Sequence, residues 1–226
     1  MPLDLHSPPR PLIYLITSGE TTGQTTPAAE DFSSVLQLVR AAVVARIDLV
    51  QLREKNLSAS VLYQLATSAA GITKGSATKL LINDRSDIAA AAGADGVHLT
   101  TSSLPTAVVR QSFGDGFLIG VSTHSLEEAR RAREGGADFA VFGPVFDTAS
   151  KKEFGEPPGL TSLASVCSEL SPFPILALGG VMIGNVAECI RAGARGVAAI
   201  RMLQQPAQLA DVVEEILSCD PGNDTN

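Results

Sequence analysis

The sequence predicts a single α/β domain folded as a closed (β/α)8 barrel, the TIM-barrel class. Short apolar runs alternate eight times with longer segments of helical period, and eight βα units in about 200 residues favour a closed parallel barrel over an open sheet. The 226 residues are 45% hydrophobic, mainly Ala, Val, Leu and Ile without Trp, which suits helices packed closely on buried strands. A Gly-Ala sequence also recurs where predicted helices lead into strands.

The predicted strands are short apolar runs bounded by polar or turn-forming residues, as expected for strands buried on both faces. In chain order they are LIYLI at 12–16, LVQL at 49–52, LLI at 80–82, GVHL at 96–99, LIGV at 118–121, FAVF at 139–142, ILAL at 175–178 and VAAI at 197–200. Each is followed by a segment whose apolar residues recur every three or four positions, as on one face of a helix. These helices are predicted at 31–45, 60–73, 87–92, 106–112, 126–134, 160–170, 184–192 and 207–217.

The recurring Gly-Ala sequence explains how three of these helices end. It occurs as Gly93-Ala94, Gly136-Ala137 and Gly193-Ala194, each just before a predicted strand. Glycine adopts the left-handed conformation that terminates a helix, and alanine allows the helix to approach the barrel closely. The motif is therefore structural and carries no catalytic chemistry.

Composition excludes several classes of function. A net charge of −7 without a basic cluster argues against a nucleic-acid partner. Cys167, Cys189 and Cys219 lack the spacing of a zinc site or a disulfide framework, so reduced thiols and a cytoplasmic location are expected. Neither a membrane-spanning run nor a signal-peptide core is present, so no membrane partner is expected. The oligomeric state stays open, a homo-oligomer included.

The ends of the chain differ in composition from the rest. Residues 1–10 are polar and rich in proline, and residues 219–226 consist of turn formers and charges. We expect a flexible leader at 1–10, the barrel at 11–218 and a disordered tail at 219–226.

Polar residues gather after the predicted strands, where barrel enzymes hold their active sites. The richest cluster follows the second strand, where strand alternation places Gln51, Arg53 and Lys55 on one face. Two cations and an amide in a small volume favour an anion such as a phosphate or diphosphate. The alternative is a solvated strand end whose charges pair with neighbouring carboxylates.

Six strings occur in register along the chain: VQLREK, LINDRSDIAAAAGADGVHL, GVSTHSLEEA, GADFAVFGPVFDTASKK, ILALGGV and GARGVAAI. Together they resemble the thiamin-phosphate synthase and TenI family, from about Tyr14 to Leu217. The resemblance implies a (β/α)8 barrel of thiamin biosynthesis. The synthase joins hydroxymethylpyrimidine diphosphate to thiazole phosphate with Mg²⁺ and releases diphosphate, whereas the TenI branch tautomerises the thiazole.

The resemblance also implies site residues. It gives the pyrimidine diphosphate to Gln51, Arg53, Lys55, Asn83 and Lys151, with Thr148 and Ser150 as further hydroxyl donors, and Ser122 is also expected to bind substrate. It gives the thiazole phosphate to Gly180, Ala199, Ile200 and Arg201. Arg53 and Lys151 are expected to act in catalysis by neutralising the departing diphosphate, although a surface ion pair is the alternative for each cation. Arg201 stands where the synthase has serine, and it could either clamp the phosphate or block the site.

The resemblance gives Asp84 as a Mg²⁺ ligand, although Asp84 could instead cap the helix that begins near Asp87. Ser103 stands where the synthase has a second carboxylate ligand, so the Mg²⁺ site is expected to be weakened. His98 is expected to form hydrogen bonds within the barrel mouth. His124 precedes a capping box formed by Ser125 and Glu128, and in the TenI branch the corresponding histidine transfers protons.

Three functions follow from this pattern. The full set of predicted diphosphate contacts favours the synthase. Ser103 and His124 favour a TenI-type tautomerase instead. A non-catalytic barrel that binds a thiamin-related ligand is the third interpretation, because fold alone does not decide function.

Overall fold

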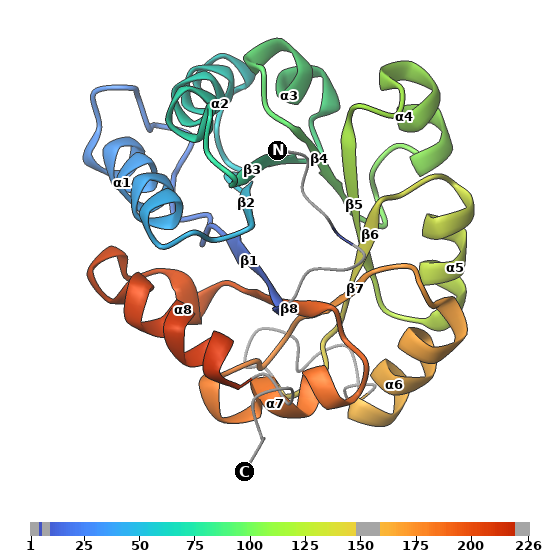
Figure 1. The fold of residues 1–226 in the computed structure, drawn as a ribbon. Coiled ribbons are helices and arrows are strands. Elements are labelled where there is room, and N and C mark those ends of the chain that lie inside the picture. Colours follow the sequence, from blue (N-terminus) through green and yellow to red (C-terminus); the bar gives the residue numbers. More distant parts are fainter. Residues whose placement is uncertain (1–4, 6–9, 148–158, 220–226) are drawn as a thin grey trace.

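The computed structural model describes residues 5, 10–147 and 159–219, and it confirms the closed parallel barrel. Neighbouring strands pair in chain order, and the first strand closes the sheet against the eighth (Figure 1). The strands are β1 (Leu12–Ile16), β2 (Leu49–Leu52), β3 (Lys79–Asn83), β4 (Gly96–Leu99), β5 (Leu118–Thr123), β6 (Phe139–Phe142), β7 (Ile175–Ala177) and β8 (Gly196–Ala199).

Helices form the outer ring of the barrel (Figure 1). They are α1 (Glu30–Val44), α2 (Ala59–Thr73), α3 (Ser86–Ala92), α4 (Thr106–Phe113), α5 (Leu126–Glu134), α6 (Gly159–Leu170), α7 (Ile183–Arg191) and α8 (Leu209–Ser218), with 3₁₀ turns η2 (Arg201–Leu203) and η3 (Pro206–Gln208). Most predicted boundaries lie within one residue of these. The last helix begins two residues later than predicted because η3 occupies Pro206–Gln208.

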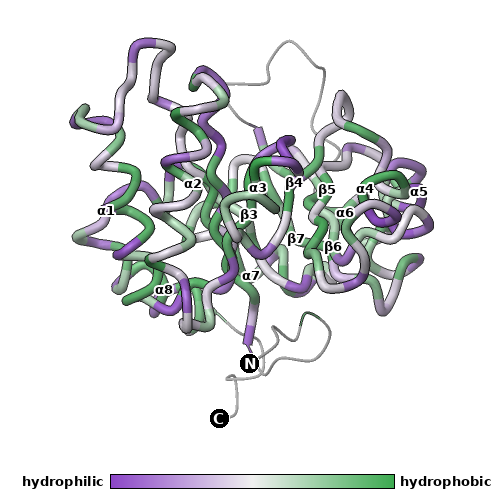
Figure 2. The backbone as a smooth tube through the Cα atoms, turned by 90° about the horizontal axis from the view of Figure 1, so that it is seen from above, coloured by the Kyte–Doolittle hydropathy of each residue, from purple (hydrophilic) through white to green (hydrophobic). Residues whose placement is uncertain are grey.

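Alternate residues of the strands point into the barrel and form an inner core, while the others pack under the helices. Hydrophobic backbone segments accordingly run through the middle of the molecule in Figure 2. We expected an interior of mainly Val, Ile, Leu and Ala. This expectation is incomplete, because the rings of Tyr14, His98 and Phe139 also fill the interior, with centroids 5.6 to 6.3 Å apart. The glycines at positions 96, 120 and 196 make the room that these rings and the neighbouring strands need.

The three predicted helix ends are confirmed. Gly93, Gly136 and Gly193 have φ values of 73°, 87° and 94°, in the left-handed region. The amide of the following alanine returns to the last turn in each case, and Ala137 N, for example, donates to Ala132 O at 3.0 Å. The next residue then enters the barrel.

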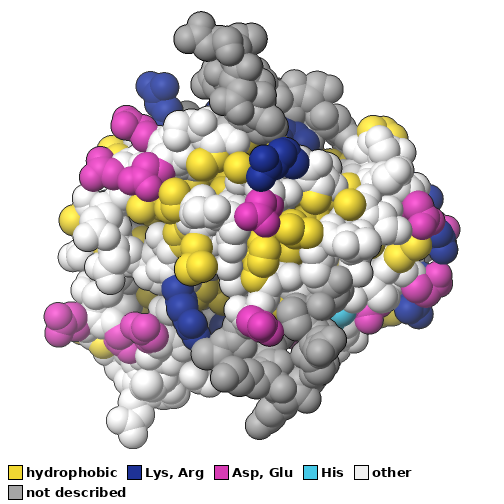
Figure 3. Space-filling view, turned by 90° about the horizontal axis from the view of Figure 1, so that it is seen from below, with side chains coloured by type: hydrophobic (Ala, Val, Ile, Leu, Met, Phe, Trp, Pro, Cys, Tyr) yellow, Lys and Arg dark blue, Asp and Glu magenta, His cyan; other side chains and the backbone are white. Residues whose placement is uncertain are grey.

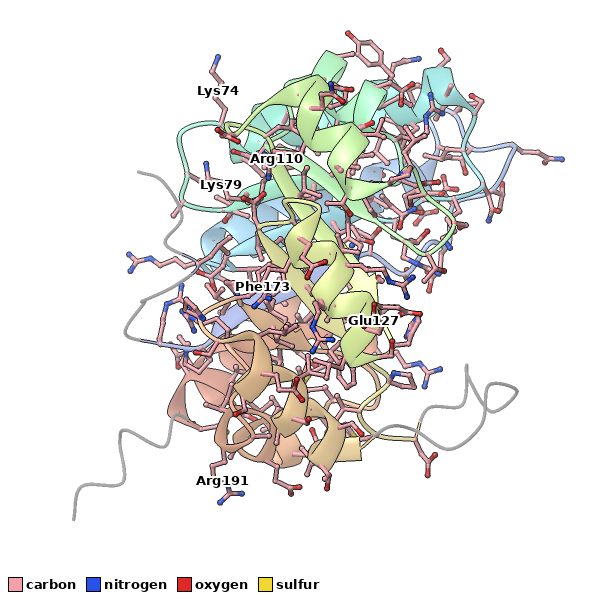
Figure 4. The ribbon with its side chains drawn as sticks, turned by 90° about the vertical axis from the view of Figure 1, so that its right-hand side faces the viewer. Lys74, Lys79, Arg110, Glu127, Phe173 and Arg191 are labelled. Carbon is pink, nitrogen blue, oxygen red and sulfur yellow. The ribbon has the colours of Figure 1, made fainter. Side chains whose placement is uncertain are left out.

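Three aspartates at the amino ends of strands hold the floor of the barrel together. Asp48, Asp95 and Asp138 each accept a hydrogen bond from the first amides of a neighbouring strand, at 2.6 to 2.9 Å. Each also pairs with a cation, respectively Arg10, Lys79 and Arg110, at 2.7 to 2.8 Å. Figure 4 shows Lys79 and Arg110 toward the same end of the molecule. These hydrogen bonds and ion pairs stabilise the barrel at the end opposite the predicted site.

Replacing Asp138 with alanine should therefore lower the free energy of unfolding without changing the mouth. The variant leaves the Ile119 amide and the Arg110 guanidinium without their carboxylate. A buried donor left unsatisfied costs about 1–3 kcal/mol. Urea denaturation measures this loss, and Asp115→Ala is the matched control because Asp115 is exposed. Equal stability of the two variants would contradict this role for Asp138.

Two residues of the predicted leader are packed against the barrel. Leu5 is 6% exposed and belongs to the inner core, and Arg10 pairs with Asp48. The flexibility expected for residues 1–10 stays a prediction. No helix in the described part of the chain is long and apolar enough to cross a membrane.

The outer face over α7 and α8 carries hydrophobic side chains among charged ones (Figure 3). The large hydrophobic side chains with the greatest exposure are scattered over several elements, and they include Val44 on α1, Leu104 before α4 and Met182 before α7. The oligomeric state stays open, a homo-oligomer included.

Candidate active site

The carboxyl ends of the strands bring the described site residues to one mouth of the barrel. Gln51, Asn83 and Ser122 occupy inward-facing positions near the ends of β2, β3 and β5. Gln51 is almost fully buried, whereas Asn83 and Ser122 are half-buried and reach the mouth. Thr148, Ser150 and Lys151, together with the neighbouring Lys152, lie outside the described residues.

Arg53 is a half-buried cation directly after β2. Its guanidinium forms no hydrogen bond or ion pair with any residue that the structure describes, and the exposed Lys55 ammonium is equally unpaired within this part of the chain. The loop after β1 passes close by, because a Cβ on Gly19 would lie 2.8 Å from Arg53 O and 3.4 Å from Arg53 Nη1. A confined cation that has no carboxylate partner among the described residues is well placed for an anionic ligand.

Glu54 follows Arg53 in the sequence but does not pair with it. Its carboxylate is buried, at 3% exposure, and turns away from the cations toward the loop after β1. Thr17 Oγ1 and Thr21 Oγ1 donate to it at 2.5 and 2.6 Å, and the Thr21 amide donates at 3.3 Å. Thr17 Oγ1 in turn accepts from the Arg53 amide at 2.9 Å. The sequence analysis did not predict that Glu54 binds the loop after β1. Strand alternation could have indicated it, because Glu54 lies on the opposite face of the strand from Arg53 and Lys55.

A chain of buried polar side chains crosses the barrel below the mouth. Gln51 Nε2 donates to Tyr14 Oη at 2.8 Å, and Tyr14 Oη lies 3.1 Å from His98 Nδ1. His98 Nε2 lies 2.9 Å from Ser122 Oγ. Burial raises the pKa of the Tyr14 phenol and lowers the pKa of His98 to about 3, so both groups are neutral. The expected hydrogen bonding of His98 is confirmed, but Tyr14 was missed because it stands in an apolar strand.

Asp84 lies exposed at the mouth, directly after β3, and has a φ of 65°. This left-handed conformation is uncommon outside glycine and is most tolerable for Asp and Asn. The alternative role as a helix cap is wrong, because the N-cap of α3 is Arg85 and α3 has no side-chain cap. The Ser103 hydroxyl accepts from the Thr100 amide at 2.7 Å, so it stabilises its own loop. In the described part of the chain, no cluster of three or more His, Cys, Asp or Glu side chains could hold a metal ion.

His124 lies exposed between β5 and α5. Its Nδ1 is hydrogen-bonded to the Gly143 carbonyl, which requires a proton on Nδ1 and leaves Nε2 as an acceptor in the neutral ring. The predicted capping interaction is confirmed for Ser125, whose hydroxyl accepts from the Glu128 amide at 3.2 Å. Glu128 returns to the His124 amide instead of the Ser125 amide, at 2.6 Å, and so also fixes the backbone at His124.

The opposite side of the mouth is built from backbone. Gly179 and Gly180 have φ values of 95° and 65°, and a Cβ on Gly180 would lie 2.6 Å from Phe146 Cβ. Ala199 ends β8, Ile200 precedes η2, and Arg201 is exposed with a guanidinium that no described residue contacts by hydrogen bond or ion pair. A narrow turn after β7 thus lies next in the barrel order to the end of β8, which Arg201 follows.

Gln204 joins the two sides of the mouth, which the sequence analysis did not predict. Its Nε2 donates to Ile16 O at 2.9 Å and to Ile200 O at 2.8 Å, and its Oε1 accepts from the Ser18 amide at 3.2 Å. The side chain therefore links the end of β8 to the loop after β1, where the barrel closes.

The chain matches the family model described as thiamine monophosphate synthase over residues 14–203. A thiamine-phosphate synthase of Methanoculleus marisnigri is 42% identical over 163 residues, which cover 72% of this chain and 77% of the relative. One from Chlorobium luteolum is 37% identical over 196 residues, covering 87% and 86% respectively. Among solved structures, a thiamine phosphate pyrophosphorylase from Pyrococcus furiosus superposes with a TM-score of 0.74 at 28% identity, covering 91% of this chain and 96% of that one.

Proposed function

Because the chain belongs to the thiamine monophosphate synthase family, we propose that it is a transferase of thiamin biosynthesis that joins hydroxymethylpyrimidine diphosphate to thiazole phosphate. The observation that carries this proposal is the half-buried Arg53 guanidinium, which lies against the loop after β1 at Gly19 and has no carboxylate partner among the described residues. Such a cation suits a diphosphate better than a structural ion pair.

In the proposed reaction, the bond between the pyrimidine methylene carbon and the diphosphate oxygen breaks, and the diphosphate leaves with the electron pair. The thiazole nitrogen then donates its lone pair to the resulting carbocation. Arg53 stabilises the charge that grows on the diphosphate, with Lys151, Thr148 and Ser150 as further proposed donors. Asn83 and Lys55 bind the same substrate, while the turn at Gly180 with residues 199–201 receives the thiazole phosphate.

Mg²⁺ is the proposed cofactor, and Asp84 would hold it. The exposed Asp84 carboxylate fits this ion, which is often bound by one or two carboxylates together with phosphate oxygens. When bound, the ion would supply positive charge to the diphosphate. Ser103 offers only a neutral hydroxyl that is already bonded to Thr100, which supports a weakened site.

A second candidate function, thiazole tautomerisation, is favoured by one observation. The Gly143 carbonyl holds the proton of His124 on Nδ1, so Nε2 is free to accept a proton from a substrate. In this interpretation His124 is the catalytic acid/base. The deciding experiment is a product assay with both thiazole isomers, with and without the pyrimidine diphosphate. Coupled product only when the diphosphate is present supports the synthase, and isomerisation without it supports the tautomerase.

His124→Ala separates the two functions. In a synthase, we expect the coupling rate to change by less than about threefold, because His124 is not required for the departure of the diphosphate. In a tautomerase, we expect the isomerisation rate to fall by about 10²–10⁴-fold, the usual effect of losing a general acid/base. Steady-state assays of both activities measure the difference. Ser125→Ala is the matched control, since it removes the α5 cap and leaves the imidazole in place. A collapse of coupling in His124→Ala alone would contradict the expectation.

A further inference from the structure

With the Gln51 amide nitrogen facing Tyr14, the hydrogen-bonded chain Gln51–Tyr14–His98–Ser122 has one direction that satisfies all its members. Tyr14 Oη accepts a hydrogen bond from Gln51 Nε2, so its own proton needs an acceptor. Tyr14 has no solvent exposure, so bulk water does not take this role. Among the described residues, the acceptor within reach is His98 Nδ1, on the far side of the barrel ring from β1 (Figure 1).

This direction determines the tautomer of His98. Nδ1 must be unprotonated to accept from Tyr14, so the neutral ring carries its proton on Nε2 and donates it to Ser122 Oγ. While the Gln51 amide nitrogen faces Tyr14, the opposite tautomer would leave the Tyr14 hydroxyl proton buried without an acceptor, which is costly. The edge-on packing of Phe139 against Tyr14, with centroids 5.6 Å apart, keeps both rings in place.

At the two ends of this hydrogen-bonded series, Ser122 and Gln51 each have one polar group with a defined hydrogen-bonding role. Ser122 Oγ already accepts from His98, so its own proton is directed to another acceptor, and the residue is half-buried at the mouth. Gln51 turns its nitrogen to Tyr14, and no described residue donates to its carbonyl oxygen. Ser122 thus offers a donor and Gln51 an acceptor.

We propose that Tyr14 and His98 are positioning residues that hold Ser122 as a donor and Gln51 as an acceptor, and thereby select the substrate ring. The complementary ligand is a ring that presents an acceptor nitrogen and a donor amino group. This inference rests on the proposed function, in which that ring is the aminopyrimidine of the diphosphate substrate. Tyr14 and His98 themselves touch neither the substrate nor the reacting atoms.

The first test measures the tautomer in the intact protein with ¹⁵N-labelled histidine. The His98 signals, assigned by their loss in His98→Gln, should show a pyrrole-type Nε2 and a pyridine-type Nδ1. Tyr14→Phe removes the hydroxyl that fixes this state, so both tautomers should then be populated. A protonated Nδ1 in the unaltered protein would overturn the proposal. This measurement needs no catalytic activity, so it can fail or succeed independently of the proposed function.

The second test compares the pyrimidine diphosphate with an analogue that has hydrogen in place of the amino group. Tyr14→Phe should lower the preference for the natural substrate by roughly tenfold, as expected when one oriented hydrogen bond is lost, mainly through KM. Phe139→Leu is the matched control, because it disturbs the packing of the same rings and no hydrogen bond. Retained preference in Phe139→Leu supports positioning, whereas an equal loss in both variants would show that only packing matters.

Discussion

Arg53→Ala should lower kcat/KM for coupling by about 10²–10³-fold, the range seen when one charge-stabilising donor is removed from an active site. The guanidinium is confined beside the loop after β1 and has no carboxylate partner in the described part of the chain, so its removal frees no buried acid. The thermal midpoint should therefore change little. Steady-state kinetics and calorimetry with inorganic diphosphate measure the two effects.

The matched control for this variant is Arg40→Ala. Arg40 is an exposed arginine on α1, remote from the carboxyl ends of the strands, and its loss changes the net charge by the same amount. We expect it to leave coupling unchanged. If Arg53→Ala binds diphosphate as tightly as the unaltered protein, Arg53 does not belong to the anion site and the main support for the synthase is lost.

Asp84→Asn should lower coupling turnover at fixed Mg²⁺ by about 10²-fold and raise the Mg²⁺ concentration needed for half-maximal rate. The expected size corresponds to a few kcal/mol of charge stabilisation lost with the ion. Asparagine tolerates the left-handed conformation that Asp84 adopts, so this substitution removes the charge and preserves the backbone. Mg²⁺ titrations of the coupling rate measure both effects.

Ser103→Asp is the reciprocal experiment. It introduces a carboxylate where the family resemblance implies a second Mg²⁺ ligand, and it should lower the half-maximal Mg²⁺ concentration in the unaltered Asp84 background. Loss of the hydroxyl that accepts from the Thr100 amide has a structural cost, although a carboxylate oxygen can accept the same bond. If neither variant changes the Mg²⁺ response while isomerisation depends on His124, the tautomerase interpretation is the better one.

The sequence by itself determined the barrel, its strand order and the mouth that holds the polar residues. Periodicity alone separates strands from helices here, because buried strands such as LIYLI and FAVF contrast with helices of period 3.6. Once eight parallel strands close, residues after each strand must meet at one end, as Arg53, Asp84 and Gly180 do. The left-handed ends at Gly93, Gly136 and Gly193 followed from the same local chemistry.

Only the tertiary structure decided which polar groups are paired and which are free. Glu54 lies between Arg53 and Lys55 in sequence, yet it bonds to Thr17 and Thr21 from another loop. Tyr14 looked like one more apolar strand residue until barrel closure brought His98 within 3.1 Å of its hydroxyl. Hydrogen bonds of this kind join residues separated by 33 to 84 positions, and local sequence patterns carry no information on such distances. The free energy of a buried polar group depends on its hydrogen-bond partner, and these partners are distant in sequence. Strand order could therefore be predicted, whereas the positions of the protons could not.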